Sequence, residues 1–215
     1  MEKLVKQLRK TNTVAEIKNA FVDLIYSKGF RSMNVTDITR AAGIGRGTFY
    51  THYTDKYDLL EKIEDELLDQ LQSDLKNVMP NAMQWLIVDK NAATPAPFIL
   101  ETLNNFYQNR RLIAALLSEK GDPHFIGKVK KIIFADLDSS LTKLDKQVTV
   151  ADKIPEDYAR EFTIDEVMGV IVYWISKAHP EEPAEVAQII TKLQNEAPMQ
   201  LFSMKKDKER KSKHE

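Results

Sequence analysis

Apolar residues recur at helical spacing along nearly the whole chain, and glycine and proline divide the pattern into separate segments. No alternating run of β-branched residues indicates a strand. With 215 residues, 43% of them apolar, the chain can bury a hydrophobic core, and it has no cysteine with which to form a disulfide. We therefore expect an all-α protein that folds without covalent cross-links.

The sequence lacks the signals of membrane, secreted and enzymatic proteins. No apolar stretch approaches the roughly eighteen residues of a membrane span, and the first ten residues mix basic with apolar side chains, unlike a signal peptide. Together with the absence of cysteine, this favours a cytoplasmic protein. The four histidines show no metal-ligand spacing, and no Ser, His and acid grouping or phosphate-binding loop occurs. We expect no catalysis, no cofactor and no metal site.

The first two predicted helices are separated by glycine. Thr13 is a suitable N-cap for the first helix, which an apolar stripe continues as far as Gly29. Thr36 can cap a short second helix that stops at Gly43. A short helix followed by a glycine turn is typical of the first half of a helix-turn-helix.

A third short helix, over residues 46–52, follows the turn at Gly45. Phe49 and Tyr53 lie four residues apart and are therefore predicted to face inward. The remaining residues form a polar face nearly free of carboxylates: Arg46, Gly47, Thr48, Tyr50, Thr51 and His52. A helix with such a face fits the major groove of B-DNA, so we expect it to be a recognition helix.

Charge is distributed unevenly along the chain. The formal net charge is −1, but residues 1–60 carry ten basic and six acidic side chains, a surplus of four positive charges. The rest of the chain is therefore acidic. A basic head on an acidic body is typical of a phosphate-binding module joined to another kind of domain.

These patterns predict three regions. Residues 1–60 form a DNA-binding domain, and Asp55 with Asp58 caps a long fourth helix that leads out of it. Residues 61–203 form a larger helical regulatory and dimerisation domain. Residues 204–215 are a charged tail that is expected to be disordered, because it has no apolar surface to bury.

The N-terminal region resembles the TetR family of bacterial transcriptional regulators. The match runs without a gap through about fifty residues. The matching residues are Thr13, Ile17, Ala20, Leu24, Gly29-Phe30, Val35-Thr36-Asp37-Ile38, Ala41-Ala42-Gly43-Ile44, Gly47-Thr48-Phe49-Tyr50, His52-Tyr53, Lys56 and Leu59-Leu60. One departure is Gly45, which stands where the family often has serine as the N-cap of the recognition helix.

The resemblance implies roles for individual residues. Residues matching Thr36, Tyr50 and Lys56 hold phosphates, whereas those matching Arg46, Gly47, Thr48 and His52 approach base edges. The C-terminal part is loosely similar to regulators of dihydroxyacetone kinase operons. The implied partners are double-stranded operator DNA, a second copy of the chain and an unknown small-molecule effector.

The last two predicted helices, over residues 156–178 and 183–195, are candidates for the dimer interface. Apolar residues cover too much of the first helix for it to pack only on its own domain. Two such helix pairs related by a twofold axis would form a four-helix interface, which the resemblance also implies. The predicted contacts are Val167, Ile171, Trp174, Val186, Ile189 and Ile190.

Two functions fit this pattern. In the first, the protein is a repressor released from its operator by a small organic effector held in an apolar cavity with a few polar anchors. In the alternative, the protein is a DNA-bound co-activator whose C-terminal domain binds a protein partner, which would require a large exposed apolar patch outside the dimer interface. The effector, the operator sequence, the regulated genes and the sign of regulation stay open, as does any DNA contact of the basic N-terminal arm or the tail.

Overall fold

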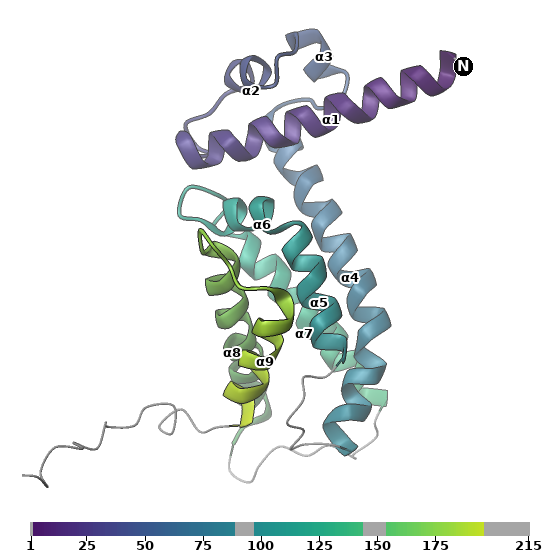
Figure 1. The fold of residues 1–215 in the computed structure, drawn as a ribbon, viewed down its shortest axis with the longest axis vertical. Helices are drawn as coiled ribbons and strands as arrows, with labels where there is room; N and C mark the ends of the chain where they lie inside the picture. Colours follow the sequence, from purple (N-terminus) through teal and green to yellow (C-terminus); the bar gives the residue numbers. More distant parts are fainter. Residues whose placement is uncertain (1, 89–96, 144–153, 196–215) are drawn as a thin grey trace, which may run out of the picture.

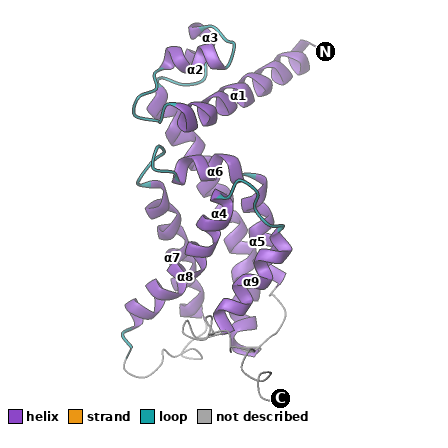
Figure 2. Cartoon of the chain, turned by 60° about the vertical axis from the view of Figure 1, so that its left-hand side comes forward, coloured by secondary structure: helices purple, strands orange, loops and turns teal. Residues whose placement is uncertain are grey.

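The computed structural model describes residues 2–88, 97–143 and 154–195. Every regular element in these ranges is a helix, which confirms the all-α prediction (Figure 2). The helices are α1 (Glu2–Ser27), α2 (Val35–Ala41), α3 (Arg46–Tyr50), α4 (Lys56–Val88), α5 (Pro97–Gln108), α6 (Arg110–Leu117), α7 (Phe125–Lys143), α8 (Glu156–Ser176) and α9 (Pro183–Asn195).

The helices form a small head and a larger body (Figure 1). Helices α1, α2 and α3 make up the head, and α5 to α9 lie together beneath it. Helix α4 begins in the head and runs along the body, where it packs against α7. The predicted domain boundary at residue 60 falls inside this continuous helix, and the division into residues 1–60 and 61–203 stays a prediction. The predicted tail, residues 204–215, lies outside the described residues.

The start of the first helix differs from the prediction. Helix α1 begins at Glu2, so Thr13 lies inside it and is not its N-cap. The preceding segment is rich in Lys, Arg, Gln and Leu and contains neither glycine nor proline. Because these residues favour the helix, the helical pattern extends through a possible capping residue.

The cap of the second helix also differs from the prediction. Asn34, not Thr36, is the N-cap of α2. The Asn34 side chain accepts a hydrogen bond from the Asp37 amide at 3.0 Å, and the Asp37 carboxylate accepts one from the Asn34 amide at 2.9 Å. This reciprocal pair satisfies two backbone donors, whereas a single hydroxyl at Thr36 would satisfy one.

The predicted glycine stops are confirmed. Gly29 has a φ of +83° and donates to the carbonyls of Leu24 and Ile25, and Gly43 has a φ of +66° directly after α2. These left-handed conformations favour glycine and end both helices. The chain is therefore turned twice within fifteen residues, which places α2 and α3 across α1.

A candidate DNA interface and its link to the body

Helix α3 is anchored by its inner face. Gly45 is its N-cap, with extended backbone angles and no side-chain cap, as the sequence predicts. Phe49 is fully buried and Tyr53 is 5% exposed, so both predicted inward positions are confirmed. Their ring centroids lie 5.6 Å apart. Because this aromatic pair fixes the helix, the opposite face is held in a defined orientation.

The outer face of α3 is polar and exposed. Arg46, Gly47, Thr48, Tyr50 and Thr51 are all exposed, and Tyr50 remains 55% exposed although its ring contacts Phe49. The structure thus brings five of the six predicted recognition residues onto one open face.

His52 is placed differently from these five residues. Its side chain is half-buried and lies beside Tyr53, with ring centroids 6.1 Å apart. It lines an open hollow of about 380 Å³ together with residues of α1 and α4. His52 follows the last residue of α3, Tyr50, and does not lie on the exposed face of that helix.

Thr36 connects the two short helices. It lies in the first turn of α2, and its hydroxyl accepts a hydrogen bond from the Arg46 guanidinium at the start of α3. A guanidinium has five N–H donors, so Arg46 retains others for a ligand, and the Thr36 hydroxyl can still donate its own hydrogen. The contact restricts Arg46 before any partner binds.

Lys56 was expected to bind phosphate, but its side chain is instead bonded to the backbone of its own chain. Its ammonium donates to the carbonyl oxygens of Phe30, Arg31 and Met33 at 3.0, 3.0 and 2.9 Å. It also lies over the rings of Phe30 and Tyr57. Burial, and to a lesser extent the charge of Lys28, lowers the Lys56 pKa. All three ammonium hydrogens are engaged, so a phosphate contact would have to replace one of these bonds.

The start of α4 follows the prediction more closely. The Asp55 carboxylate accepts hydrogen bonds from the amides of Tyr57 and Asp58 at 2.7 and 2.8 Å, which confirms it as the cap. The Asp58 carboxylate accepts a bond from the Thr54 amide at 2.7 Å and a second from Lys62 at 3.0 Å. The Thr54 bond, followed by the Lys62 bond, lowers the Asp58 pKa. These bonds fix the first turn of α4 to the connection that follows α3.

A second set of contacts joins the head to the body at the end of α1. The Phe30 amide donates to the Lys120 carbonyl at 2.9 Å, and the Lys120 ammonium donates to the Tyr26 carbonyl at 3.0 Å. The Tyr26 hydroxyl donates to the Arg111 carbonyl at 3.2 Å, and Arg111 forms an ion pair with Asp23. Sequence reasoning missed this junction because its partners lie more than eighty residues apart.

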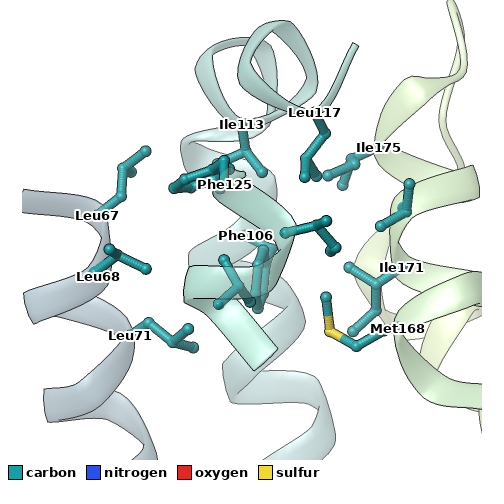
Figure 3. Close-up of a pocket in the computed structure, with 13 residues that line it drawn as sticks. Leu67, Leu68, Leu71, Phe106, Ile113, Leu117, Phe125, Met168, Ile171 and Ile175 are labelled. Atoms are coloured by element: carbon teal, nitrogen blue, oxygen red, sulfur yellow. The ribbon is translucent and has the colours of Figure 1, made fainter. Parts of the chain in front are cut away.

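The body contains an apolar cavity between α4, α5, α6, α7 and α8 (Figure 3). Its volume is about 30 Å³, far below the roughly 300 Å³ at which pockets for small-molecule ligands begin. All of the side chains that line it are apolar. They include Leu67 and Leu71 of α4, Phe125 of α7 and Met168 of α8. The predicted apolar lining is present, but polar anchors are not among the lining residues.

Most of the predicted dimer contacts are buried within their own chain. Ile171 is 5% exposed, and Trp174, Val186 and Ile190 are each 2% exposed. The Trp174 ring stacks on Tyr107 at 5.6 Å, and its indole N–H donates to the Glu181 carbonyl at 2.8 Å. Val167 is half-buried, and only Ile189 is clearly exposed. These four buried side chains are corrected to core residues, because they leave no surface for a partner.

Three aromatic side chains of α8 that were not among the predicted contacts point to solvent. Tyr158, Phe162 and Tyr173 are 70%, 65% and 69% exposed. Their spacing of four and eleven residues places them on one side of the helix. Their apolar character was visible in the sequence, but the sequence does not say which apolar side of α8 faces its own core.

Two features are absent from the part of the chain that the structure describes. No helix there combines the length and the apolar character that crossing a bilayer requires. No cluster of three His, Asp or Glu side chains suited to a metal ion occurs there either.

Two family models match the chain. The model described as bacterial regulatory proteins, tetR family, matches residues 19–63, which contain the end of α1, all of α2 and α3, and the start of α4. The model described as transcriptional regulator C-terminal region matches residues 93–196. Neither model bears on the narrower similarity to dihydroxyacetone kinase regulators, which stays a prediction.

The curated relatives match this chain over only part of their own length. The chain is 20% identical over 181 residues to the uncharacterized HTH-type transcriptional regulator YxbF of Bacillus subtilis, covering 83% of this chain and 44% of the relative. It is 28% identical over 91 residues to the HTH-type transcriptional regulator SAR0097 of Staphylococcus aureus, covering 40% and 48%. The chain thus spans about half the length of the curated relatives it matches.

Solved structures share the fold. A TetR transcriptional regulator from Streptococcus agalactiae matches with a TM-score of 0.56 and 22% identity, covering 89% of this chain and 98% of the other. NalD of Pseudomonas aeruginosa, the secondary repressor of the MexAB-OprM multidrug efflux pump, matches with 0.59 and 17%, covering 86% and 96%. FadR of Bacillus subtilis in complex with stearoyl-CoA matches with 0.55 and 17%, covering 84% and 96%.

The two family models, the helix-turn-helix geometry and the shared fold agree with one another. The chain belongs to the TetR family of bacterial transcriptional regulators, and α2 and α3 are its DNA-binding helix-turn-helix.

Proposed function

We propose that this protein is a dimeric repressor that binds operator DNA through α3 and is released by a small organic effector. The observation that carries the proposal is the exposed polar face of α3, which the buried side chains of Phe49 and Tyr53 hold in place. A helix presented in this way can enter the major groove without refolding. Its side chains then meet base edges while neighbouring groups meet phosphates.

In the proposed complex the residues of the head divide into two groups. Arg46, Gly47 and Thr48, at the start of α3, approach base edges. Tyr50 and the Thr36 hydroxyl approach phosphates. Thr51 extends the same exposed face, and His52 lies at its margin. Lys56 acts mainly by holding the loop before α2, because its ammonium is already bound to three carbonyls.

The proposed dimer interface is the exposed face of α8 with the adjoining part of α9. It consists of Tyr158, Phe162 and Tyr173, together with Ile189 of α9. Exposed aromatic side chains offer large contact area, and a second copy of the same face would cover them on both protomers. The twofold axis would then place two recognition helices about 34 to 36 Å apart, one turn of DNA.

The proposed effector site is the apolar cavity of the body. Its lining favours an apolar ligand, but its volume of about 30 Å³ requires the surrounding helices to move apart when a larger molecule enters. Because Leu67, Leu68 and Leu71 belong to α4, such a movement would be transmitted along the helix that also forms part of the head. A change in head spacing would break simultaneous contact with two half-sites.

Operator binding is the direct test of the proposal. The purified protein should bind a palindromic duplex, and the logarithm of its binding constant should fall linearly with the logarithm of salt concentration. Arg46→Ala and Thr48→Ala should each relax base preference by about 1 to 3 kcal/mol per lost contact, measured by competition among mutated half-sites. Lys76→Ala, an exposed lysine farther along α4, is the matched control and should leave preference unchanged. Specificity that survives both α3 substitutions would assign recognition to another element.

Effector release needs a separate experiment. A thermal-shift screen of small apolar metabolites should find a ligand that stabilises the free protein by about 2.7 kcal/mol at a hundredfold excess over its Kd. The same ligand should weaken operator binding by the factor with which DNA weakens ligand binding. Hits that stabilise the protein and leave operator affinity unchanged would contradict effector release while leaving DNA binding intact.

A further inference from the structure

Glu64 is a buried carboxylate with one unpaired oxygen. It lies on α4 two turns from the start of the helix, and its side chain is 1% exposed. Its Oε2 accepts a hydrogen bond from the Lys128 ammonium of α7 at 2.5 Å. Among the described residues no group donates to Oε1, although this atom is also buried. A buried acceptor without a donor is costly as an ion, and the cost falls when the group takes up a proton.

A second carboxylate competes for the same ammonium. Asp122, in the loop between α6 and α7, has a side chain that is 12% exposed, and its Oδ2 lies 3.8 Å from the Lys128 ammonium. As ions, Glu64, Asp122 and Lys128 carry one excess negative charge, and the two carboxylates are far less exposed than the Lys128 side chain. One bound proton makes the group neutral.

The charged neighbours of Glu64 lie on α7, in the α6–α7 loop and on α4 itself. Lys128 belongs to α7 and Asp122 to the α6–α7 loop, while Asp65 of α4 acts on Lys128. Burial raises the Glu64 pKa from 4.5 to about 7, with the Lys128 hydrogen bond opposing the rise and Asp122 adding to it.

The loop that carries Asp122 is tightly constrained. The Asp122 amide donates to the Leu116 carbonyl at 2.9 Å, and the Gly121 amide donates to the Ser118 carbonyl at 2.9 Å. A Cβ at Gly121 would lie 2.2 Å from the Leu116 carbonyl oxygen, so the backbone leaves no room for a side chain there. Because the loop is restricted in this way, a displacement of Asp122 would also displace the residues next to it in the loop.

The same loop also contacts the head. Lys120, two residues before Asp122, accepts the Phe30 amide at its carbonyl and donates its ammonium to the Tyr26 carbonyl. One short turn thus faces, through Asp122, the Lys128 ammonium that is paired with Glu64, and contacts the end of α1 through Lys120. A displacement of this turn would therefore change its contacts with both.

We propose that Glu64 holds one proton beneath the α6–α7 loop, close to the Asp122 carboxylate, and that release of this proton loosens the hold of the loop on the DNA-binding head. On release the proton passes to solvent, and the Glu64 carboxylate is then ionised beside the Asp122 carboxylate and a single ammonium. The repulsion between the two carboxylates is relieved when the loop moves away from α4. The proton is an input separate from the proposed organic effector.

The sign of the stability effect follows from the direction of the shift. The folded protein holds a proton that the unfolded chain releases above a pH of about 4.5, so the contribution is fully present below that pH. It is lost as pH rises through about 7. The wild type should therefore lose unfolding free energy between pH 5.5 and pH 8 relative to Glu64→Gln, in which the side chain stays neutral. Glu61→Gln, an exposed glutamate one turn earlier, is the matched control and should behave as the wild type.

Residue-specific carboxyl NMR tests the site directly. The Glu64 resonance, identified by its absence in Glu64→Gln, should titrate near neutral pH. Asp122→Asn should lower the midpoint because it removes the competing charge, and Lys128→Met should raise it because it removes the ammonium. A midpoint close to 4.5 in the wild type would overturn the proposal, and this measurement needs no variant that folds poorly.

Hydrogen exchange tests the link to the head. After correction for intrinsic exchange, the Phe30 amide should lose protection several-fold from pH 6 to pH 8 in the wild type and in Glu61→Gln. It should not do so in Glu64→Gln. The Ala42 amide, which donates to the Ile38 carbonyl inside the head, is the internal control. Phe30 protection that is the same at both pH values would show that the proton does not reach the head. Neither measurement uses DNA, so failure here is distinguishable from failure of operator binding.

Discussion

Helices α3 and α8 differ in how well the sequence identifies their exposed side. In α3 one side is apolar and buried and the other is polar and exposed, so polarity alone identifies the surface. In α8 both sides are apolar. Ile164, Met168 and Ile171 face the core, whereas Phe162 and Tyr173 face solvent. The hydrophobic pattern of a helix therefore identifies its exposed face when that face binds a polar partner such as DNA. It does not do so when the exposed face is itself apolar.

The largest expected effect separates the two sides of α8. Ile171→Glu should destabilise the protomer by about 3 kcal/mol or more, because it places a carboxylate in the core and removes apolar packing. Phe162→Glu should change protomer stability by less than about 0.5 kcal/mol, because the site is exposed, but should dissociate the dimer. Denaturant unfolding and sedimentation measure the two effects. An intact dimer in Phe162→Glu would leave this face available to a protein partner.

A smaller loss is expected at Lys56 in the head. Lys56→Met removes three hydrogen bonds from an ammonium to the carbonyls of the α1–α2 connection, and we expect a cost of about 2 kcal/mol in urea unfolding. Lys76→Met, at an exposed site on the same helix, should cost far less. Unchanged stability, with a log-log salt slope for operator binding lower by about one, would restore the phosphate role that sequence reasoning gave Lys56.

Two glycines of the head should respond with opposite signs. A Cβ would meet nothing within 4 Å at either Gly43 or Gly47, so space does not distinguish them. Gly43 has a φ of +66°, and Gly43→Ala should cost about 1 kcal/mol or more. Gly47 lies within α3, and Gly47→Ala should stabilise the helix by up to about 1 kcal/mol. Thermal unfolding of both variants measures the contrast, and a loss of stability at both sites would mean that α3 is not a regular helix.

The smallest effect is expected at the ion pair between the head and the body. The side chains of Arg111 and Asp23 are both 59% exposed, so water and salt screen their attraction. A double-mutant cycle with Arg111→Ala and Asp23→Ala should give a coupling below about 0.5 kcal/mol. A coupling above about 1 kcal/mol would show that this junction is rigid rather than solvated.

The sequence predicts local features of the head well. The all-helical fold, the Asp55 cap and the inward positions of Phe49 and Tyr53 depend on residues within a few positions of each other. The Asn34 cap was missed although it is equally local, because Thr36 is also of a residue type that caps helices, and only the structure shows the reciprocal bond at Asn34.

Non-local roles could not be predicted in the same way. Lys56 resembles a surface lysine in the sequence, and its three carbonyl partners lie more than twenty residues away. Trp174 resembles an interface residue until Tyr107 is placed against it. The partner of Glu64 lies sixty-four residues along the chain. In each case the missing information is which distant segment packs against the residue, and periodicity does not contain it.

The contacts between the end of α1 and the α6–α7 loop also limit how such proteins can be recombined. The bond from the Phe30 amide to the Lys120 carbonyl joins two backbones and would survive a change of sequence on either side. The contacts made by Asp23 and Tyr26 depend on side chains and would not. A chimera that grafts a foreign DNA-binding head onto this body should therefore keep these two residues together with Arg111. Without them, only the backbone bond and the continuous helix α4 would join the new head to this body.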